Sequence, residues 1–197
     1  MSNATTVPDR PLVAPDRPPA ADAALLIYRG FKFGAAFFGW LIAIAMSVLL
    51  SAAVSAVALL TAEIVDYNRS DAEAAPAAAG LTASVMAVVV IAVAFYSGGY
   101  VAGRLARFDG ARNGFGVWMV AVLVAVLAAG AGALLNSQYD WLTDVQRPDV
   151  ALSNGALATG GVIAAVAVIV VTLLAAIIGG KAGQRYHEKI DRLIEAD

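Results

Sequence analysis

Four long apolar blocks constrain this chain more than any other feature of its sequence. They cover residues 33–60, 81–103, 114–135 and 156–180, and none of them carries a charged side chain. A helix needs about 20 apolar residues to cross the roughly 30 Å hydrocarbon core of a bilayer, and each block reaches that length. At 1.5 Å per residue the first block makes a helix of roughly 42 Å, so this helix tilts or leaves the bilayer at one end. The sequence therefore predicts an all-α membrane protein with four transmembrane helices.

The composition agrees with a membrane protein and excludes several other classes. Of the 197 residues, 60% are hydrophobic and 14% are charged, and the chain has no cysteine. A soluble domain is closer to half apolar and a quarter charged. These values exclude a soluble enzyme, a disordered chain, a disulfide scaffold and a thiolate metal site. The first block is also too long for a secretory signal peptide, whose apolar region is about 7–15 residues.

The positive charges predict the orientation. All of the 13 Lys and Arg residues except Arg69 and Arg147 lie in the N-terminal tail, the 104–112 loop or the C-terminal tail. The other two loops are acidic; they hold Glu63, Asp66, Asp71, Glu73, Asp140, Asp144 and Asp149. The positive-inside rule then places both termini in the cytoplasm, and four spans are consistent with this because an even number returns the chain to its starting side.

The sequence divides the chain into three parts. Residues 1–24 are a proline-rich tail in which Pro8-Asp9-Arg10-Pro11 recurs at 15–18, and we expect it to be disordered, either as a solvated leader or as a docking peptide. Residues 25–185 are the four-helix transmembrane domain. Residues 186–197 are predicted to end the last helix as a short amphipathic cytoplasmic segment.

Matching residues at an offset of 80 predict an internal repeat. Gly30 matches Gly110, and further pairs cluster at corresponding ends of the spans: Gly34 with Gly114, Gly80 with Gly160, Gly99 with Gly179 and Gly103 with Gly183. Each half is then one helical hairpin with an outer loop, 61–80 or 136–155. Two spans per half give both halves the same orientation, so the repeats are parallel.

Two Gly-x-x-x-Gly pairs predict where helices pack. Gly99 and Gly103 end the second span, and Gly179 and Gly183 end the fourth. Residues four apart share a helix face, so each pair forms a flat groove that a second backbone can approach. We expect spans two and four to cross there, and homodimerisation through the same faces is the open alternative.

Three serines form a polar stripe on the first span. Ser47, Ser51 and Ser55 are spaced four residues apart and lie on one face. They would either line a polar pathway or serve as small packing residues whose hydroxyls bond to their own helix.

The basic residues near the predicted cytoplasmic surface are candidates for binding anionic lipid headgroups or phosphate. They are Lys32, Arg104, Arg107, Arg112, Lys181 and Arg185. Amides at the starts of spans one and three would add to such a site. The alternative is that these charges only set the topology.

The sequence offers no catalytic residues. The spans contain no central acid, histidine or lysine, and no zinc-binding His-Glu-x-x-His, phosphate-binding loop or nucleophile elbow occurs. We therefore expect no enzymatic activity, no metal, no cofactor and no nucleic-acid partner.

The run Gly98-Gly99-Tyr100-Val101-Ala102-Gly103-Arg104-Leu105-Ala106-Arg107-Phe108-Asp109-Gly110 resembles a signature of small four-span bacterial membrane proteins, common in actinobacteria, to which no activity is assigned. The resemblance covers the four spans and implies a bacterial cytoplasmic membrane. It supplies no catalytic residues. The second half of the repeat departs from the signature, because Gln184 stands where the first half has Arg104.

Two functions follow from these patterns. The first is a non-enzymatic accessory or scaffolding protein that packs through its glycine grooves against itself or another membrane protein, with membrane lipids around it. The alternative is a small oligomeric channel or transporter, which the repeat and the serine stripe favour.

Overall fold

The computed structural model describes residues 30–106, 108–139 and 154–194, and every regular element in these ranges is a helix. The chain divides into two units, residues 1–30 and residues 31–197, and the helices belong to the second. The predictions for the tail 1–24, for Arg107 and for the side chains beyond Arg185 lie outside what is described.

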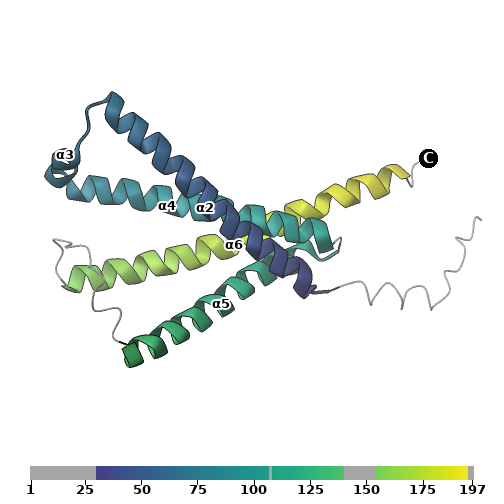
Figure 1. Ribbon diagram of the computed structural model, residues 1–197. Helices are drawn as coiled ribbons and strands as arrows, with labels where there is room; N and C mark the ends of the chain where they lie inside the picture. The colour runs from purple at the N-terminus through teal and green to yellow at the C-terminus, as the bar shows by residue number, and fades with distance from the viewer. Residues whose placement is uncertain (1–29, 107, 140–153, 195–197) are drawn as a thin grey trace, which may run out of the picture. The chain divides into compact units, whose positions relative to one another are not determined.

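Four of the helices are long and apolar enough to cross a membrane (Figure 1). They are α2 (Phe33–Ile64), α4 (Pro76–Ala106), α5 (Gly110–Tyr139) and α6 (Asn154–Ile194). The predicted fold class, an all-helical chain with four membrane-length helices, is confirmed. The chain is a multi-pass integral membrane protein.

Each helix is longer than its apolar block, because local turn chemistry and not hydropathy decides where a helix stops. α2 continues to Ile64, where Asp66 takes a left-handed conformation with φ of 53°. The amide of Tyr67 donates to the carbonyl of Ala62 at 2.8 Å, and the amide of Asp66 donates to that of Glu63 at 3.4 Å. This is a Schellman turn, which satisfies the last carbonyls of the helix.

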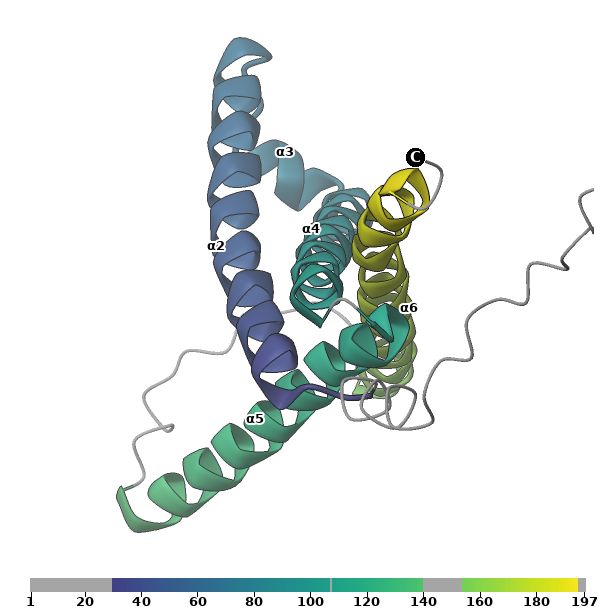
Figure 2. The same ribbon diagram turned by 90° about the vertical axis from the view of Figure 1, so that its right-hand side faces the viewer.

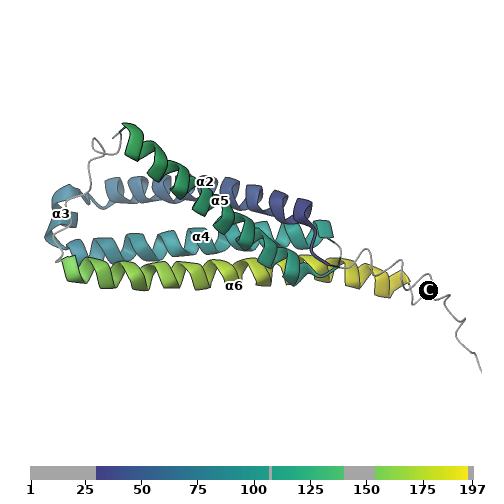
Figure 3. The ribbon, with the colours of Figure 1, turned by 90° about the horizontal axis from the view of Figure 1, so that it is seen from below.

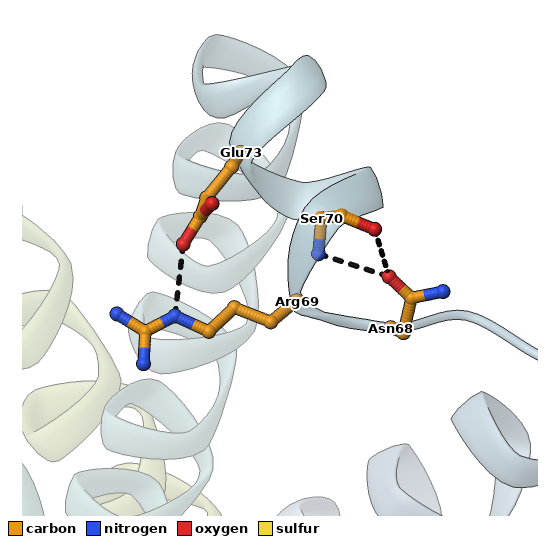
Figure 4. Close-up of polar contacts among 4 residues, drawn as sticks. All are labelled: Asn68, Arg69, Ser70 and Glu73. Atoms are coloured by element: carbon orange, nitrogen blue, oxygen red, sulfur yellow. Dashed lines mark hydrogen bonds and ion pairs between the residues drawn. The ribbon is translucent and has the colours of Figure 1, made fainter.

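A short helix, α3 (Arg69–Ala74), occupies part of the segment predicted as an outer loop. Asn68 caps it, since the side-chain oxygen of Asn68 accepts from the amide of Ser70 at 2.9 Å and the hydroxyl of Ser70 donates to the same oxygen (Figure 4). The guanidinium of Arg69 lies 2.8 Å from the carboxylate of Glu73, one turn later. Pro76 then begins α4, a position that proline favours because a first-turn amide has no partner within the helix.

Basic side chains lie at one end of all four long helices, and acidic side chains lie at the other end, around the connection between α2 and α4. We call the end with Lys32, Arg104, Arg112, Lys181 and Arg185 the basic end, and the end with Glu63, Asp66, Asp71 and Glu73 the acidic end. α2 and α5 start at the basic end, whereas α4 and α6 finish there. α6 continues beyond this end to Ile194 as one unbroken helix (Figure 3).

α4 and α6 form the centre of the helical unit and run side by side in the same direction (Figures 1 and 3). α2 packs on α4, and α5 contacts α6, α4 and α2, whereas α2 and α6 do not touch within the described residues. Away from the basic end, α2 and α5 diverge from the central pair in opposite directions (Figure 2).

Among the described residues, the core of this unit extends from the middle of the long helices to the basic end. Its buried members are small or medium-sized residues. They include Ala35, Ala36 and Ala43 of α2, Val90, Ala94, Ala102 and Ala106 of α4, Val117 and Val120 of α5, and Ala176 of α6. The large apolar side chains of the half nearer the acidic end are exposed, as expected where a helix faces lipid.

Candidate functional site

The α4–α6 crossing is built from glycines whose backbones touch. A Cβ placed on Gly99 would overlap the carbonyl oxygen of Ala176, and one on Gly103 would overlap that of Gly180. From the other side, a Cβ on Gly179 would overlap the carbonyl of Tyr96, and one on Gly183 that of Tyr100. The structure thus brings all four glycines of the two Gly-x-x-x-Gly pairs into one contact within the chain.

These contacts are reciprocal at a fixed spacing. Gly99 meets residue 176 while Gly179 meets residue 96, and Gly103 meets residue 180 while Gly183 meets residue 100. Every member of the first contact lies 80 positions from its counterpart in the second. The crossing is therefore two-fold symmetric in this region.

The outer two helices break that symmetry. α2 meets α4 where Gly39 and Gly98 lie against each other's carbonyls, with Ala43 beside them. α5 meets α6 through Gly110 and Gly114, whose backbones contact Gly180 and Ala176. Gly34, which the predicted repeat pairs with Gly114, has no atom from another described segment within 4 Å of its Cβ position.

Asn113 joins the start of α2 to the loop between α4 and α5. It is not among the candidate residues predicted from the sequence. It is completely buried. Its side-chain oxygen accepts from the backbone amide of Lys32 at 2.9 Å, and its side-chain nitrogen donates to the carbonyl of Asp109 at 3.1 Å. A buried amide is costly unless both of its ends are bonded, so this residue fixes the chain around it. A polar residue just ahead of an apolar block is the signal that could have identified it.

The structure gives a reason why residue 184 is glutamine, although the predicted repeat pairs it with Arg104. The side-chain oxygen of Gln184 accepts from the amide of Gly110, the first residue of α5, at 2.6 Å. Arginine, which stands at the corresponding position 104, has no acceptor and could not do this. Because the amides of Gly110 and Lys32 are already bonded, these two are not available to a phosphate group.

A further polar contact joins α5 to α6 inside the core. The indole nitrogen of Trp118 donates to the hydroxyl oxygen of Thr172 at 3.2 Å, and Thr172 itself donates to the carbonyl of Val168 at 2.7 Å. Other hydroxyls of the long helices bond in the same way to carbonyls of their own helix, three or four residues back; they are Ser47, Thr61, Thr82, Ser84, Ser97 and Ser137.

Ser51 and Ser55 are different, because in the described part of the chain their hydroxyls have no hydrogen-bond partner. Both line a groove of about 720 Å³ between α2 and α4, on the acidic-end side of the Gly39–Gly98 contact. We call it the α2–α4 groove; it is lined by Ser51, Val54, Ser55, Ala58, Tyr67, Ala72, Ala78, Ala79, Thr82, Ala83, Met86, Ala87, Val90 and Ile91. Ser47 belongs to the same stripe but lies outside this lining.

The described basic residues other than Arg69 lie at one end of the bundle but on different helices. Lys32 precedes α2 and is half-buried, and Arg104 of α4 donates to the hydroxyl of Tyr100 at 3.3 Å. Arg112, Lys181 and Arg185 are exposed. Arg112 lines a second groove, of about 590 Å³, which we call the Arg112 groove; its other lining residues are Phe31, Phe33, Phe115, Gly116, Met119, Val120 and Leu123.

In the described ranges, no group of three or more histidine, cysteine or acidic side chains could hold a metal ion. No protein-family model, curated protein or solved structure matches the chain. The resemblance to small four-span bacterial proteins therefore stays a prediction, and the function has to be argued from the two grooves and the glycine core.

Proposed function

We propose that this protein is a non-enzymatic accessory protein of a bacterial cytoplasmic membrane, with both termini in the cytoplasm, that holds a transmembrane helix of another protein in its α2–α4 groove. The observation that carries the proposal is the groove itself. Small residues make up most of its walls, and they include two unpartnered hydroxyls, those of Ser51 and Ser55, on helices that diverge from each other.

Small residues support a helix as the occupant. Within a bilayer, helices associate where alanine, serine and glycine let their backbones approach, since lipid chains gain nothing from such surfaces. The lining of the groove contains alanines on both walls, Ala58 on α2 and Ala79, Ala83 and Ala87 on α4. The Gly-x-x-x-Gly faces are occupied by the α4–α6 crossing, so they do not serve as the docking surface.

The hydroxyls of Ser51 and Ser55 favour a protein helix over a lipid chain as the occupant of the α2–α4 groove. Ser51 and Ser55 are one turn apart on the same face of α2. An interhelical hydrogen bond to a partner contributes about 0.6–2 kcal/mol in a membrane, and an acyl chain offers no such group. The glycine core at the basic end would hold α2 and α4 in place while their far halves receive the partner.

Site-specific crosslinking in the native membrane tests the proposal. A photoreactive residue at Ala58 is expected to crosslink to a transmembrane segment of a second protein, whereas one at Ala56, exposed on α2 but outside the groove lining, is not. Gentle purification should then recover that protein in near-stoichiometric amount.

A bulky substitution inside the α2–α4 groove can be compared with the same substitution outside it. Ala58→Leu is expected to reduce the recovered partner about tenfold or more, and Ala56→Leu to leave it unchanged, while both variants elute as the wild type does in gel filtration. Equal recovery with both variants, or equal crosslinking from both positions, would overturn the proposal.

The same two hydroxyls favour one alternative, a small oligomeric channel or transporter. If a second copy closed the groove, Ser51 and Ser55 would line a polar path between the copies. Crosslinks from Ala58 would then join two copies of this chain, and Ser51→Leu would abolish flux into liposomes without lowering expression. Flux that survives Ser51→Leu would count against this reading.

A further inference from the structure

The Arg112 groove is lined by one cationic side chain and otherwise by apolar residues and a glycine. Phe31 and Phe33, at the start of α2, form one side, and α5 forms the other with Phe115, Met119 and Leu123. These five side chains are between 43% and 61% exposed, so the groove is open along its length.

The residues contributed by α5 form a single stripe with the arginine at its head. Arg112, Phe115, Met119 and Leu123 are spaced three, four and four residues apart, which places them on one face of the helix. From Arg112 to Leu123 the helix rises about 16 Å. That distance is about half of the roughly 30 Å hydrocarbon core, or one leaflet.

The charge of Arg112 is not neutralised by an acidic side chain within the described part of the protein. Its guanidinium has neither a carboxylate nor a hydrogen-bond partner there, and the ion pair that is described, Arg69 with Glu73, lies at the acidic end. A guanidinium binds a phosphate through two parallel hydrogen bonds, and this geometry makes arginine well suited to phosphate recognition.

The groove wall is held in place by the core. The ring of Phe31 lies directly on the backbone of Gly116, so closely that a Cβ on Gly116 would overlap its Cε2 atom. The adjacent residue, Lys32, is fixed through its amide by the buried Asn113. The wall therefore does not depend on a ligand to form.

We propose that the Arg112 groove binds one anionic glycerophospholipid from the leaflet at the basic end. The phosphate lies on the Arg112 guanidinium and one acyl chain follows Phe115, Met119 and Leu123 into the membrane. A cation at the mouth of a leaflet-deep apolar groove matches the headgroup and one acyl chain of a phospholipid, and its charge favours a lipid with net negative charge over a zwitterionic one.

Native mass spectrometry of the delipidated, full-length protein tests this, with phosphatidylglycerol and phosphatidylcholine of the same acyl chains as probes. The wild type is expected to retain one phosphatidylglycerol at concentrations where it retains no phosphatidylcholine. Arg112→Gln should weaken phosphatidylglycerol binding about fivefold or more. Arg185→Gln removes the same charge from the same end but outside the groove, and should leave binding unchanged.

Two further arms test the acyl chain and the source of the phosphate. Leu123→Trp fills the groove and is expected to weaken binding with the charge intact, whereas Ala125→Trp, on the opposite face of α5, is not. Glycerol phosphate at millimolar concentration should not displace the lipid. Equal effects of Arg112→Gln and Arg185→Gln, equal retention of the two lipids, or displacement by glycerol phosphate would each overturn the proposal.

Discussion

At the basic end the four long helices meet backbone to backbone, whereas toward the acidic end the same helices separate. Glycines occur in both halves. Gly99 and Gly103 touch carbonyl oxygens of α6, while Gly130, Gly132 and Gly161 have no described atom from another segment within 4 Å of their Cβ positions. A small residue thus permits close approach but does not cause it.

The polar side chains repeat this difference. Near the basic end, Asn113 and Gln184 bond to backbone amides of other segments, so they connect helices. Toward the acidic end, Ser51 and Ser55 face an open groove. The glycine crossing of the first half is completed within one chain, whereas the α2–α4 groove of the second half leaves small and polar surface for another molecule.

The largest expected effect comes from adding volume to the glycine crossing. Gly103→Leu places a side chain where the backbone of Gly180 lies, and α4 and α6 must separate. Because the obstacle is backbone, we expect a loss of about 3 kcal/mol or more in the free energy of unfolding. Heating the detergent-solubilised protein and measuring the fraction that remains monodisperse would detect it.

Gly130→Leu is the control for the open half, and its stability should stay within about 0.5 kcal/mol of the wild type. Where Gly103→Leu yields no protein, the milder pair Gly103→Ala and Gly130→Ala gives the same comparison. Equal destabilisation by both members of a pair would remove the distinction between the two halves.

A loss of stability of intermediate size is expected when the buried side-chain amide of Asn113 is removed. Asn113→Ala leaves the amide of Lys32 without its partner, whereas the carbonyl of Asp109 keeps the hydrogen bond from the backbone amide of residue 113. The expected loss is about 2 kcal/mol in the free energy of unfolding, measured by denaturant titration with circular dichroism. Ser84→Ala, which removes an exposed hydroxyl bonded to its own helix, should change stability little. A similar change in the two variants would contradict the connecting role of Asn113.

The smallest loss of stability is expected when Gln184 is replaced by arginine. Gln184→Arg restores the residue of the first repeat but removes the acceptor for the amide of Gly110, at a cost of about 1 kcal/mol. Gln184→Glu keeps an acceptor and should retain most of the wild-type stability in the same titration. If arginine and glutamate behaved alike, the hydrogen bond would not explain the departure from the repeat.

Several features of the candidate site could not be predicted from the sequence. The Gly-x-x-x-Gly pairs were visible as packing residues, but the same motif serves equally for contact within a chain and between chains. The Gln184 difference was visible too, but its role depends on Gly110, which lies 74 positions earlier. Asn113 carried only a weak signal, because a single amide beside a loop is usually solvated.

Hydropathy along the chain is enough to identify a membrane protein with four long helices, since it is summed over a local window and needs no knowledge of neighbours. It did not determine where α2 ends or that α3 forms, because these depend on individual turn residues such as Asp66 and Asn68. The pairing of each glycine with a backbone, and the places where the grooves open, depend on how the helices pack in three dimensions. A glycine has no side chain that specifies its partner, so the crossing of whole helices makes that choice.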